Sequence, residues 1–498
     1  MIIIFRAGFD NEKYCKLQSS KIKERISLFG ERLYLEFGGK IFDDFHASRV
    51  LPGFAPDSKI KMLVELKDDA EIIVSINAED IEKNKVRGDL GITYDHDVLR
   101  HIDAFRGYGL YVSAVVMTRY TASSAAEAFK KKLENLGLKV YKHYEISGYP
   151  HNIPLIVSEE GYGRNEYVET TRPIVVVTAP GPGSGKMATC LSQIYHESKK
   201  GRKSGYAKFE TFPIWNLPLN HPVNLAYEAA TADLADVNMI DHFHLEAYNT
   251  IAVNYNRDVE IFPVLNSMLE GILGECPYKS PTDMGVNMAG FCIYDNDAVC
   301  EAAGQEIIRR HYNALCDKRK GNGNDDEIDK IELLMRKLGI SAEENRACVA
   351  AALAKAEETS APAVAIQLDD GRIVTGKTSS LLGASSAALL NAIKAVAGIP
   401  DAIDVISPEV IEPIQKLKTA YLGNHNPRLH TDEILVALSV SAVNNPCAKM
   451  AFEAIPRLKY AEAHSTVILS QIDAATFRKL GMNLSCEPKY QTKKLFHN

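Results

Sequence analysis

The sequence has no excess of positive charge. Its 57 Lys and Arg residues stand against 64 Asp and Glu residues, which gives a formal net charge of −7. A protein that binds the phosphate backbone of nucleic acid along its length needs a basic surface. Nucleic acid is therefore not expected as the main partner, although this balance leaves room for a local basic cleft.

The sequence also has no Cys-x-x-Cys pair and no long apolar run near its beginning. Its nine cysteines are odd in number and widely spread, which indicates reduced cysteines, with one catalytic thiol as the alternative. The apolar run of residues 1–5 meets Arg6, so it is too short for a signal peptide or a membrane helix. We therefore expect a cytoplasmic protein with no membrane partner, and a buried strand at residues 2–5.

The length and composition predict a folded protein of several domains. At about 150 residues per domain, 498 residues correspond to roughly three domains. Hydrophobic residues make up 46% and charged residues 24%, close to the globular average. The sequence contains no repeat of fixed period.

Residues 1–150 alternate between strand-like and helix-like segments, a pattern typical of a parallel sheet covered by helices. One helix is expected at residues 125–137, where apolar residues at helical spacing end at a glycine. The expected strands are residues 2–5, 32–37, 70–76, 109–117 and 138–143. This segment is predicted to be an N-terminal Rossmann-like α/β domain, whose ligands would lie at the carboxyl ends of the strands.

The rest of the chain is predicted to form two further domains. A loop-rich stretch near residue 150 precedes a central α/β domain at residues 151–316. Residues 317–326 are charged, contain glycine and lack apolar side chains, which indicates a linker. Residues 327–498 are predicted to form an α+β domain with long helices and a hairpin that turns at Asp370 and Gly371.

The stretch from Pro173 to Thr189 carries the clearest chemistry. A β-branched run is followed by a glycine-rich turn, Lys186 and a helix-compatible segment, the order of a phosphate-binding loop. Glycines let backbone N–H groups approach an anion, the helix start adds its dipole, and the lysine adds a charge. The residues predicted to bind the phosphates of ATP are Gly181, Gly183, Ser184, Gly185, Lys186 and Thr189.

The loop departs from the standard spacing, because three residues rather than four separate Gly181 from Gly185. Met187 also takes the place of the usual Ser or Thr, so Thr189 is expected to supply the hydroxyl for Mg²⁺. The alternative is an ordinary glycine-rich turn with a solvated lysine.

Together with a second motif, this loop resembles the amidoligase domain of the CTP synthase type. The runs that carry the resemblance are Gly185 to Thr189 and Lys208-Phe209-Glu210, with Glu in place of the family's Asp. The resemblance implies that Glu210 holds Mg²⁺ and that Lys208 lies near the nucleotide. Formyltetrahydrofolate synthetase has a comparable loop, which widens the implied class to Mg-ATP ligases.

The hundred residues that follow are dense in Asn, Asp and His, which predicts a substrate pocket. Asp241 is assigned as a catalytic residue beside Lys186 and Lys208, and Arg257 as a two-point clamp for a carboxylate or phosphate. The alternative is that these residues cap helices and close turns. The residues predicted to contact substrate are Asn216, His221, Asn224, His244, Asn254, Asn256, Asp258, Asp283 and Asn287.

Over its whole length the chain resembles a bacterial family of cytosolic proteins of about 500 residues and unknown function. Residues 8–14, 46–53, 215–219 and 280–285 carry this resemblance, together with the glycine loop. Some relatives have been labelled ATP-dependent peptidases. A zinc peptidase helix needs His-Glu-x-x-His, which this sequence lacks at His196, and His242, His244 and Glu246 would approach a metal only in an extended segment.

A weaker resemblance concerns residues 363–377 and the helix at 384–397, which are similar to the hairpin and helix of cytidine-deaminase-like domains. The helix has no zinc ligands and no catalytic Glu, so the resemblance implies the fold without zinc chemistry. Such a domain would serve assembly or substrate binding. Apolar helices such as residues 434–443 fit either packing within the chain or a homo-oligomer.

The sequence therefore predicts an ATP- and Mg²⁺-dependent ligase or phosphotransferase that acts on a small acidic metabolite. The alternative is a nucleotide-binding regulator or assembly protein without turnover. An ATP-dependent peptidase is a third and disfavoured hypothesis.

Overall fold

The computed structural model describes residues 6–38, 40–87 and 91–491, and its chain divides into two compact units. We call Gly8–Glu228 with Ala235–Val299 the sheet unit. The C-terminal unit contains Ala229–Leu234 and the chain from Cys300 onward. The strand predicted at residues 2–5 lies outside the described residues.

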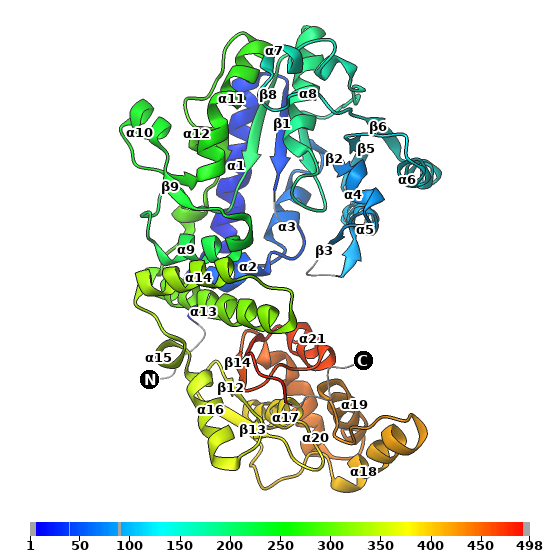
Figure 1. Ribbon diagram of the computed structural model, residues 1–498, viewed down its shortest axis with the longest axis vertical. Helices are drawn as coiled ribbons and strands as arrows, with labels where there is room; N and C mark the ends of the chain where they lie inside the picture. The colour runs from blue at the N-terminus through cyan, green and yellow to red at the C-terminus, as the bar shows by residue number, and fades with distance from the viewer. Residues whose placement is uncertain (1–5, 39, 88–90, 492–498) are drawn as a thin grey trace. The chain divides into compact units, whose positions relative to one another are not determined.

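The sheet unit is built around seven parallel strands, which confirms the predicted α/β class (Figure 1). Their order across the sheet is β11-β8-β1-β7-β2-β5-β6. The strands are β1 (Arg32–Phe37), β2 (Ala70–Asn77), β5 (Tyr111–Thr118), β6 (Lys139–Lys142), β7 (Ile174–Thr178), β8 (Ser204–Phe209) and β11 (Gly285–Val286). The four expected strands between residues 32 and 143 are thus confirmed to within two residues.

The predicted boundary near residue 150 does not separate two sheets. Strand β7 pairs with β1 on one side and with β2 on the other, with Leu33 opposite Ile174 and Ala70 opposite the same Ile174. Strands from both sides of residue 150 therefore share one hydrogen-bonded sheet and one core. The stretch that the sequence marks as loop-rich is an insertion that carries the chain from the edge strand β6 back to the centre.

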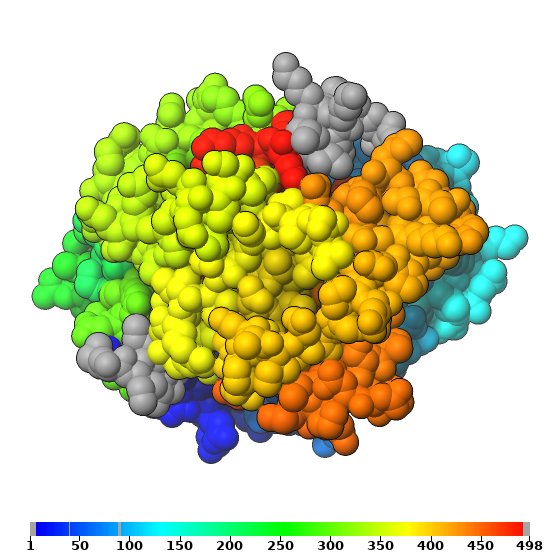
Figure 2. Space-filling view, turned by 90° about the horizontal axis from the view of Figure 1, so that it is seen from below, coloured from blue at the N-terminus to red at the C-terminus, as the bar shows by residue number. Residues whose placement is uncertain are grey.

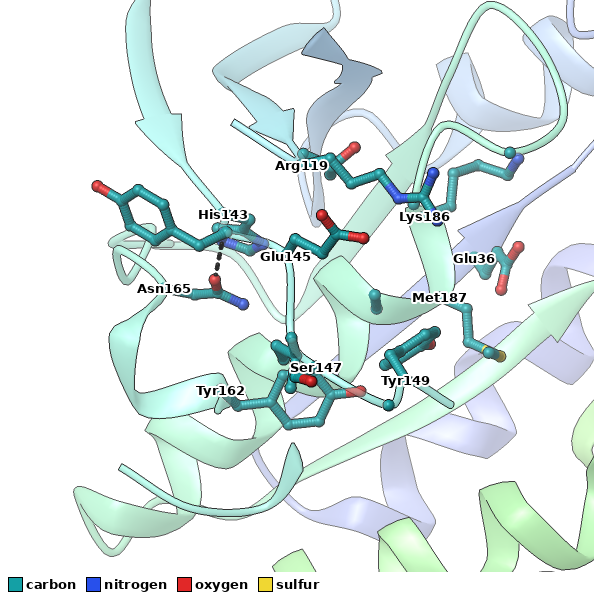
Figure 3. A pocket seen from close by; sticks show the side chains of 17 residues that line it. Glu36, Arg119, His143, Glu145, Ser147, Tyr149, Tyr162, Asn165, Lys186 and Met187 are labelled. Atoms are coloured by element: carbon teal, nitrogen blue, oxygen red, sulfur yellow. Dashed lines mark hydrogen bonds between the residues drawn. The ribbon is translucent and has the colours of Figure 1, made fainter. Parts of the chain in front are cut away.

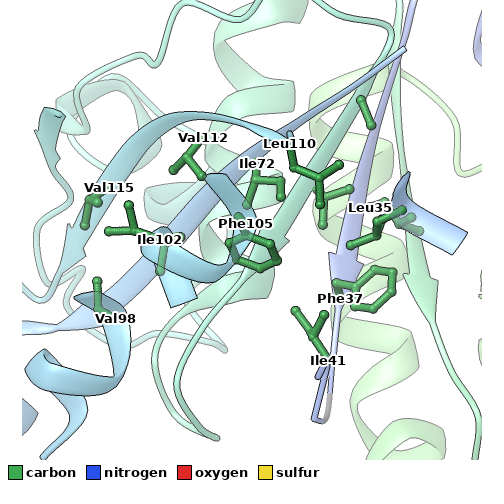
Figure 4. Packing of buried hydrophobic residues seen from close by; sticks show 14 of the residues in the cluster. Leu35, Phe37, Ile41, Ile72, Val98, Ile102, Phe105, Leu110, Val112 and Val115 are labelled. Atoms are coloured by element: carbon green, nitrogen blue, oxygen red, sulfur yellow. The ribbon is translucent and has the colours of Figure 1, made fainter. Parts of the chain in front are cut away.

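Both faces of the sheet are covered, which explains its near-continuous apolar strands. All eight residues of β2 and all five of β7 are buried. One face packs against α1 (Asn11–Phe29), α3 (Ser58–Glu65), α5 (Tyr94–Gly107) and α6 (Ser124–Asn135), as the cluster around Phe105 and Leu35 shows (Figure 4). The other face packs against α8 (Lys186–Lys199) and α11 (Asn256–Leu273).

This topology opens a crevice between β1 and β7. The chain leaves β1 toward α3 on one face of the sheet and leaves β7 toward α8 on the other face. Neighbouring parallel strands whose connections diverge in this way form the usual ligand crevice of open α/β sheets. A ligand-binding site is therefore expected at the carboxyl ends of β1, β7 and β8.

The shorter elements of the sheet unit lie mainly in its connections. They are α2 (Phe45–Val50), α4 (Ala78–Glu82), β3 (Val86–Arg87), β4 (Ile92–Thr93), α7 (Ile153–Ile156), α9 (Pro222–Ala230), β9 (Asn238–Ile240), α10 (His242–Tyr248), β10 (Val253–Tyr255) and α12 (Pro281–Met284).

The linker predicted at residues 317–326 is largely helical. Helix α13 (Asn296–Lys320) continues through residues 317–320, and α14 (Asp325–Leu338) begins five residues after it ends. Residues 317–320 are exposed, so their charges form the solvated end of a helix. An exposed helix end has the same composition as a linker, which is why the sequence did not distinguish them.

The C-terminal unit has a mixed four-stranded sheet in the order β13-β12-β14-β15. The predicted hairpin is confirmed: β12 (Ala363–Gln367) and β13 (Ile373–Lys377) are antiparallel, and Gly371 in the turn has a φ of +81°. Strands β14 (Glu462–Ser465) and β15 (Asn483–Cys486) are parallel. The helices are α15 (Ala342–Asn345), α16 (Ala347–Thr359), α17 (Ala384–Ala397), α18 (Pro408–Lys416), α19 (Thr431–Ser441), α20 (Pro446–Ala454) and α21 (Gln471–Lys479).

Part of the surface of the C-terminal unit is apolar. The yellow and orange surface in Figure 2 belongs to this unit. On and just after α19, Val436 and Val440 are each 62% exposed and Val443 is 78% exposed. The apolar helix expected at residues 434–443 thus corresponds to α19, and its outward-facing valines are exposed in the described chain.

Two further features concern the chain as a whole. All nine cysteines are free. Within the described ranges, no helix has both the length and the apolar character needed to cross a membrane.

Candidate functional site

The glycine-rich stretch predicted from the sequence forms a loop between β7 and α8. Gly185 is the N-cap of α8 and has a left-handed φ of +80°. A Cβ atom built on Gly185 would lie 2.8 Å from the Cγ2 atom of Thr118, too close for any side chain. Glycine is therefore required at this position by both backbone conformation and space.

The loop is held by β5, which lies two strands away from β7 in the sheet. The Thr118 hydroxyl at the end of β5 donates to the carbonyl of Ser184 at 3.0 Å. The Ser184 hydroxyl in turn donates to the carbonyl of Gly181 at 3.0 Å, and Ser184 is fully buried. These bonds fix the loop in one conformation, so its exposed backbone is preorganised.

The start of α8 presents unsatisfied donors. The first backbone bond of the helix runs from the N–H of Thr189 to the carbonyl of Gly185 at 2.9 Å. Among the described residues, the N–H groups of Lys186, Met187 and Ala188 have no acceptor, and the Lys186 ammonium has no ion-pair partner. Three N–H groups, a helix dipole and a free cation at one point favour an anion.

These donors open onto a cavity of about 810 Å³, which we call the loop cavity. Its volume lies within the range of small-molecule sites. Figure 3 shows Lys186 and Glu36 on one side and His143 and Asn165 on the opposite side. Arg119, which follows β5, and residues 143–149, which follow β6, complete the lining.

A second cavity of about 600 Å³ adjoins the first, and we call it the charged cavity. The two cavities share Glu36, Gly183, Lys186 and Met187. The charged cavity is also lined by ionisable side chains from β8 and the first turn of α11, with an apolar wall from the next turns of α11. Its ionisable residues include Lys208, Glu210, Arg257 and Asp258.

The ion pairs of the charged cavity centre on Lys208. The Lys208 ammonium contacts the carboxylate of Asp258 and lies 3.0 Å from the Oε1 atom of Glu210. Burial alone would lower the pKa of Lys208, but the Asp258 and Glu210 carboxylates raise it above its ordinary value, so the lysine stays charged. Burial raises the pKa of Glu210 to about 7 against the opposing effect of Lys208. Glu210 is thus a carboxyl group that changes charge near neutral pH.

This shift in pKa predicts that the stability of the protein depends on pH through Glu210. The unfolded chain releases the Glu210 proton near the ordinary pKa of 4.5, whereas the folded chain retains it to about pH 7. Between these values the folded chain binds more protons, so the free energy of unfolding falls as pH rises. Glu210→Gln cannot titrate and should gain on the order of 1–2 kcal/mol over the natural protein between pH 4.5 and 8. Urea unfolding of both proteins at pH 4.5, 6 and 8 measures this difference, and a constant difference would contradict the assignment.

The structure brings some of the predicted phosphate-binding residues into the loop cavity and buries others. Gly183, Gly185 and Lys186 line it. Ser184 is buried beneath the loop, and Gly181 is half-buried beside Tyr94 and lines neither cavity. The Thr189 hydroxyl is fully buried and accepts a bond from the Ser75 hydroxyl at 3.2 Å, so it faces the sheet.

The two residues predicted to hold Mg²⁺ are therefore not brought together. Glu210 lies in the charged cavity beside Lys208, and Thr189 lies in the core. Within the described part of the chain, no three His, Cys, Asp or Glu side chains are placed to bind one metal ion. His242, His244 and Glu246 lie on the helix α10, not on an extended segment.

The predicted catalytic residues divide in the same way. Lys186 lines both cavities and Lys208 lines the charged cavity. Arg257 also reaches that cavity, but its guanidinium is paired with Asp236 at 2.6 Å and is not free to clamp a substrate. Asp241 is fully buried and caps α10, because its carboxylate accepts from the N–H of His244. The same carboxylate also accepts from the Thr282 hydroxyl at 2.6 Å.

Of the nine residues predicted to contact substrate, Asp258 alone lines either cavity. Asn224 shows the role of the others: it is fully buried and bonds both the N–H and the carbonyl of Ile214. Six more make side-chain hydrogen bonds within the protein: His221, His244, Asn254, Asn256, Asp283 and Asn287. Asn216 lies beside Gly290, outside both cavities.

The sequence reasoning missed Glu36, Arg119 and the loop at residues 143–149. Glu36 belongs to β1, lies opposite Lys208 of β8 in the parallel register, and accepts from the Tyr206 hydroxyl at 2.6 Å. The available signal was a single carboxylate in the otherwise apolar run of residues 33–37. Glu36 is half-buried, and a carboxylate taken partly out of water needs polar partners, which makes this position a candidate for function.

Comparison with known proteins shows relatives of the same length. The chain is 57% identical to a "UPF0371 protein" of Streptococcus thermophilus (strain ATCC BAA-491 / LMD-9), over 99% of both chains. It is 59% identical to a "UPF0371 protein" of Corynebacterium glutamicum (strain R), over 98% of this chain and 99% of that protein. The resemblance to a bacterial family of about 500 residues is thereby confirmed.

Two family models also match and together span most of the chain. The first is described as "Domain of unknown function DUF1846, N-terminal" and matches residues 7–339. The second is described as "Domain of unknown function DUF1846, C-terminal" and matches residues 344–496. The sheet, its glycine loop and both cavities thus lie within the N-terminal match, and the chain belongs to the DUF1846 family.

Proposed function

We propose that this protein is an enzyme that transfers a phosphoryl group from a nucleoside triphosphate such as ATP to a small acceptor, as a ligase or phosphotransferase. The observation that carries the proposal is the start of α8, where three free N–H groups and the unpaired Lys186 face the loop cavity. A preorganised set of donors of this kind stabilises the charge of a transferring phosphate.

The arrangement of the two cavities supports transfer rather than simple anion binding. The loop cavity is large enough for a nucleotide, with Arg119 as a second cation in its lining. The charged cavity begins at the same loop residues, Gly183 and Lys186, so an acceptor held there would meet the phosphate end of the nucleotide.

We propose that the acceptor is a small metabolite. The sequence predicts an acidic one, and the structure gives no reason to keep that restriction. That expectation relied on Arg257 as a carboxylate clamp, and this guanidinium is paired with Asp236. Four carboxylates line the charged cavity, from Glu36, Glu210, Asp258 and Glu260. They disfavour a second anion there beyond the phosphates themselves.

A nucleotide sensor without turnover is the second candidate, and one observation favours it. The residue after Lys186 is Met187, and the Thr189 hydroxyl is bonded within the core, so neither supplies the loop hydroxyl that usually helps to hold Mg²⁺. Mg²⁺ that arrives with ATP would then depend on the phosphates and on the carboxylates of the charged cavity.

One experiment separates the two candidates. The full chain is incubated with Mg-ATP, first alone and then with pools of small hydroxyl- and amine-bearing metabolites, while ATP binding and phosphate release are measured. An enzyme gives saturable release of phosphate or a phosphorylated product. Binding with no release under any pool would favour the sensor, and an absence of binding would reject both candidates.

A further inference from the structure

Among the residues that the structure describes, Glu36 is the one carboxylate that lines both cavities. Its side chain extends from β1 into the crevice next to β7, the strand that leads into the glycine loop. Figure 3 shows its carboxylate between Lys186 and Met187, both of which also line the two cavities. A group at this junction would lie where a phosphate donor on one side meets an acceptor on the other.

The structure holds this carboxylate in one orientation. The hydroxyl of the fully buried Tyr206 donates to Oε2 of Glu36 at 2.6 Å, and Tyr206 precedes Lys208 by two residues on the same face of β8. The second carboxylate oxygen, Oε1, has no hydrogen-bond donor among the described residues. One oxygen is therefore fixed by the protein while the other is available to a ligand.

Two lysine side chains lie near Glu36 at this junction. Lys186 lies beside it in both cavity linings, and Lys208 faces it across the neighbouring strand. Both cations would attract a phosphate chain to the junction where the Glu36 carboxylate lies. Asp258 and Glu210 are paired with Lys208, whereas no lysine within the described ranges is ion-paired with Glu36.

We propose that Glu36 is a catalytic residue, the general base of the phosphoryl transfer; this inference rests on the proposed function. In the step, an acceptor oxygen forms a bond to the terminal phosphorus as its proton passes to the Glu36 carboxylate. The bond between that phosphorus and the bridging oxygen breaks, and its electron pair leaves with the nucleoside diphosphate. Water serves as the acceptor when no metabolite is present, so the role can be tested without knowing the natural acceptor.

The test compares Mg-ATP binding and phosphate release for the full natural chain, Glu36→Gln and Glu36→Asp. Removing a general base typically slows a reaction by a factor of about 100 to 10,000. Glu36→Gln should therefore release phosphate at least about 100-fold more slowly while binding ATP as tightly as the natural chain, and Glu36→Asp should recover part of the rate. Glu31→Gln, an exposed glutamate just before the same strand, is the matched control and should change neither quantity.

Tyr206→Phe tests how Glu36 is positioned. It removes the one hydroxyl that holds the carboxylate, so it should slow phosphate release about tenfold in the natural chain. In the Glu36→Gln background the same change should have little further effect, because residues that act through one group are not additive. Additive losses would indicate that Tyr206 acts on stability rather than through Glu36.

The remaining outcomes separate the inference from the proposed function. Unchanged release by Glu36→Gln, with ATP turnover intact, would overturn the role of Glu36 and leave the proposed function standing. Loss of ATP binding by Glu36→Gln only when Mg²⁺ is present would identify Glu36 as a metal ligand and overturn its role as a base. If the natural chain binds ATP without releasing phosphate, the sensor is favoured and the base is rejected; if it does not bind ATP, both proposals fail.

Discussion

Lys186→Ala is expected to weaken the binding of ATP about 30- to 150-fold. The variant removes the one mobile cation at the start of α8, which has no partner within the described chain and faces both cavities. A charge-assisted bond to a phosphate in a partly enclosed site is worth about 2–3 kcal/mol. Titration calorimetry with Mg-ATP and with inorganic tripolyphosphate measures the loss, and both ligands should lose similar affinity because they share the phosphate chain.

The matched control is Lys131→Ala, which removes an exposed lysine from α6 in the same unit. It should leave both affinities unchanged, since screening makes distant surface charges weak. Equal affinities for the natural chain and Lys186→Ala would remove Lys186 from the site. A loss confined to ATP, with tripolyphosphate unaffected, would place Lys186 against the nucleoside instead.

Gly185→Ala is expected to lower the free energy of unfolding by about 2–4 kcal/mol and to abolish the binding of tripolyphosphate. An alanine at a φ of +80° costs about 1 kcal/mol in backbone strain. Its Cβ would also lie within 3.0 Å of three side-chain atoms of Thr118, and overpacking of this kind adds about 1–3 kcal/mol. The loop would have to lift from β5, and the N–H groups at the start of α8 would no longer converge.

Gly183→Ala provides an unusually close control. Gly183 has a similar φ of +76°, but a Cβ built there meets nothing within 4 Å. This variant should show the backbone strain alone, about 1 kcal/mol. Combining Gly185→Ala with Thr118→Ala should recover part of the stability, because the smaller side chain relieves the contact. Urea unfolding of the natural chain, the two single glycine variants and the double variant measures these free energies of unfolding. Equal losses of stability for Gly183→Ala and Gly185→Ala would contradict the packing described for the loop.

The local elements of the fold could be predicted because their signals are local. The β-branched residues 174–177, the glycines after them and Lys186 specify strand, loop and helix within a short stretch. The pairing of strands was not predictable in this way. Leu33 lies opposite Ile174 because packing of the whole core sets the strand register. Neither segment alone contains a pattern that indicates which strand it pairs with. A sheet assembled from both sides of residue 150 was therefore interpreted as two domains.

The site was predicted in part for a similar reason. Asn224 and Asp241 have the residue types of a substrate pocket, yet their partners are the backbone of Ile214 and the first turn of α10. A side chain that satisfies a buried N–H group and one that contacts a ligand look alike in a sequence. Glu36 could not be identified from the sequence because its role depends on a hydrogen bond with Tyr206, which lies 170 positions away in the chain.

The central claim is that the glycine loop and the start of α8 bind a phosphate chain. The most direct test is hydrogen–deuterium exchange of backbone amides in the full protein, with and without saturating Mg-ATP. The N–H groups of Lys186, Met187 and Ala188 have no acceptor in the described part of the chain, so a bound phosphate should protect them from exchange. We expect protection at residues 183–188 and, more weakly, at 143–149; ATP binding that leaves the exchange of residues 183–188 unchanged would contradict the account.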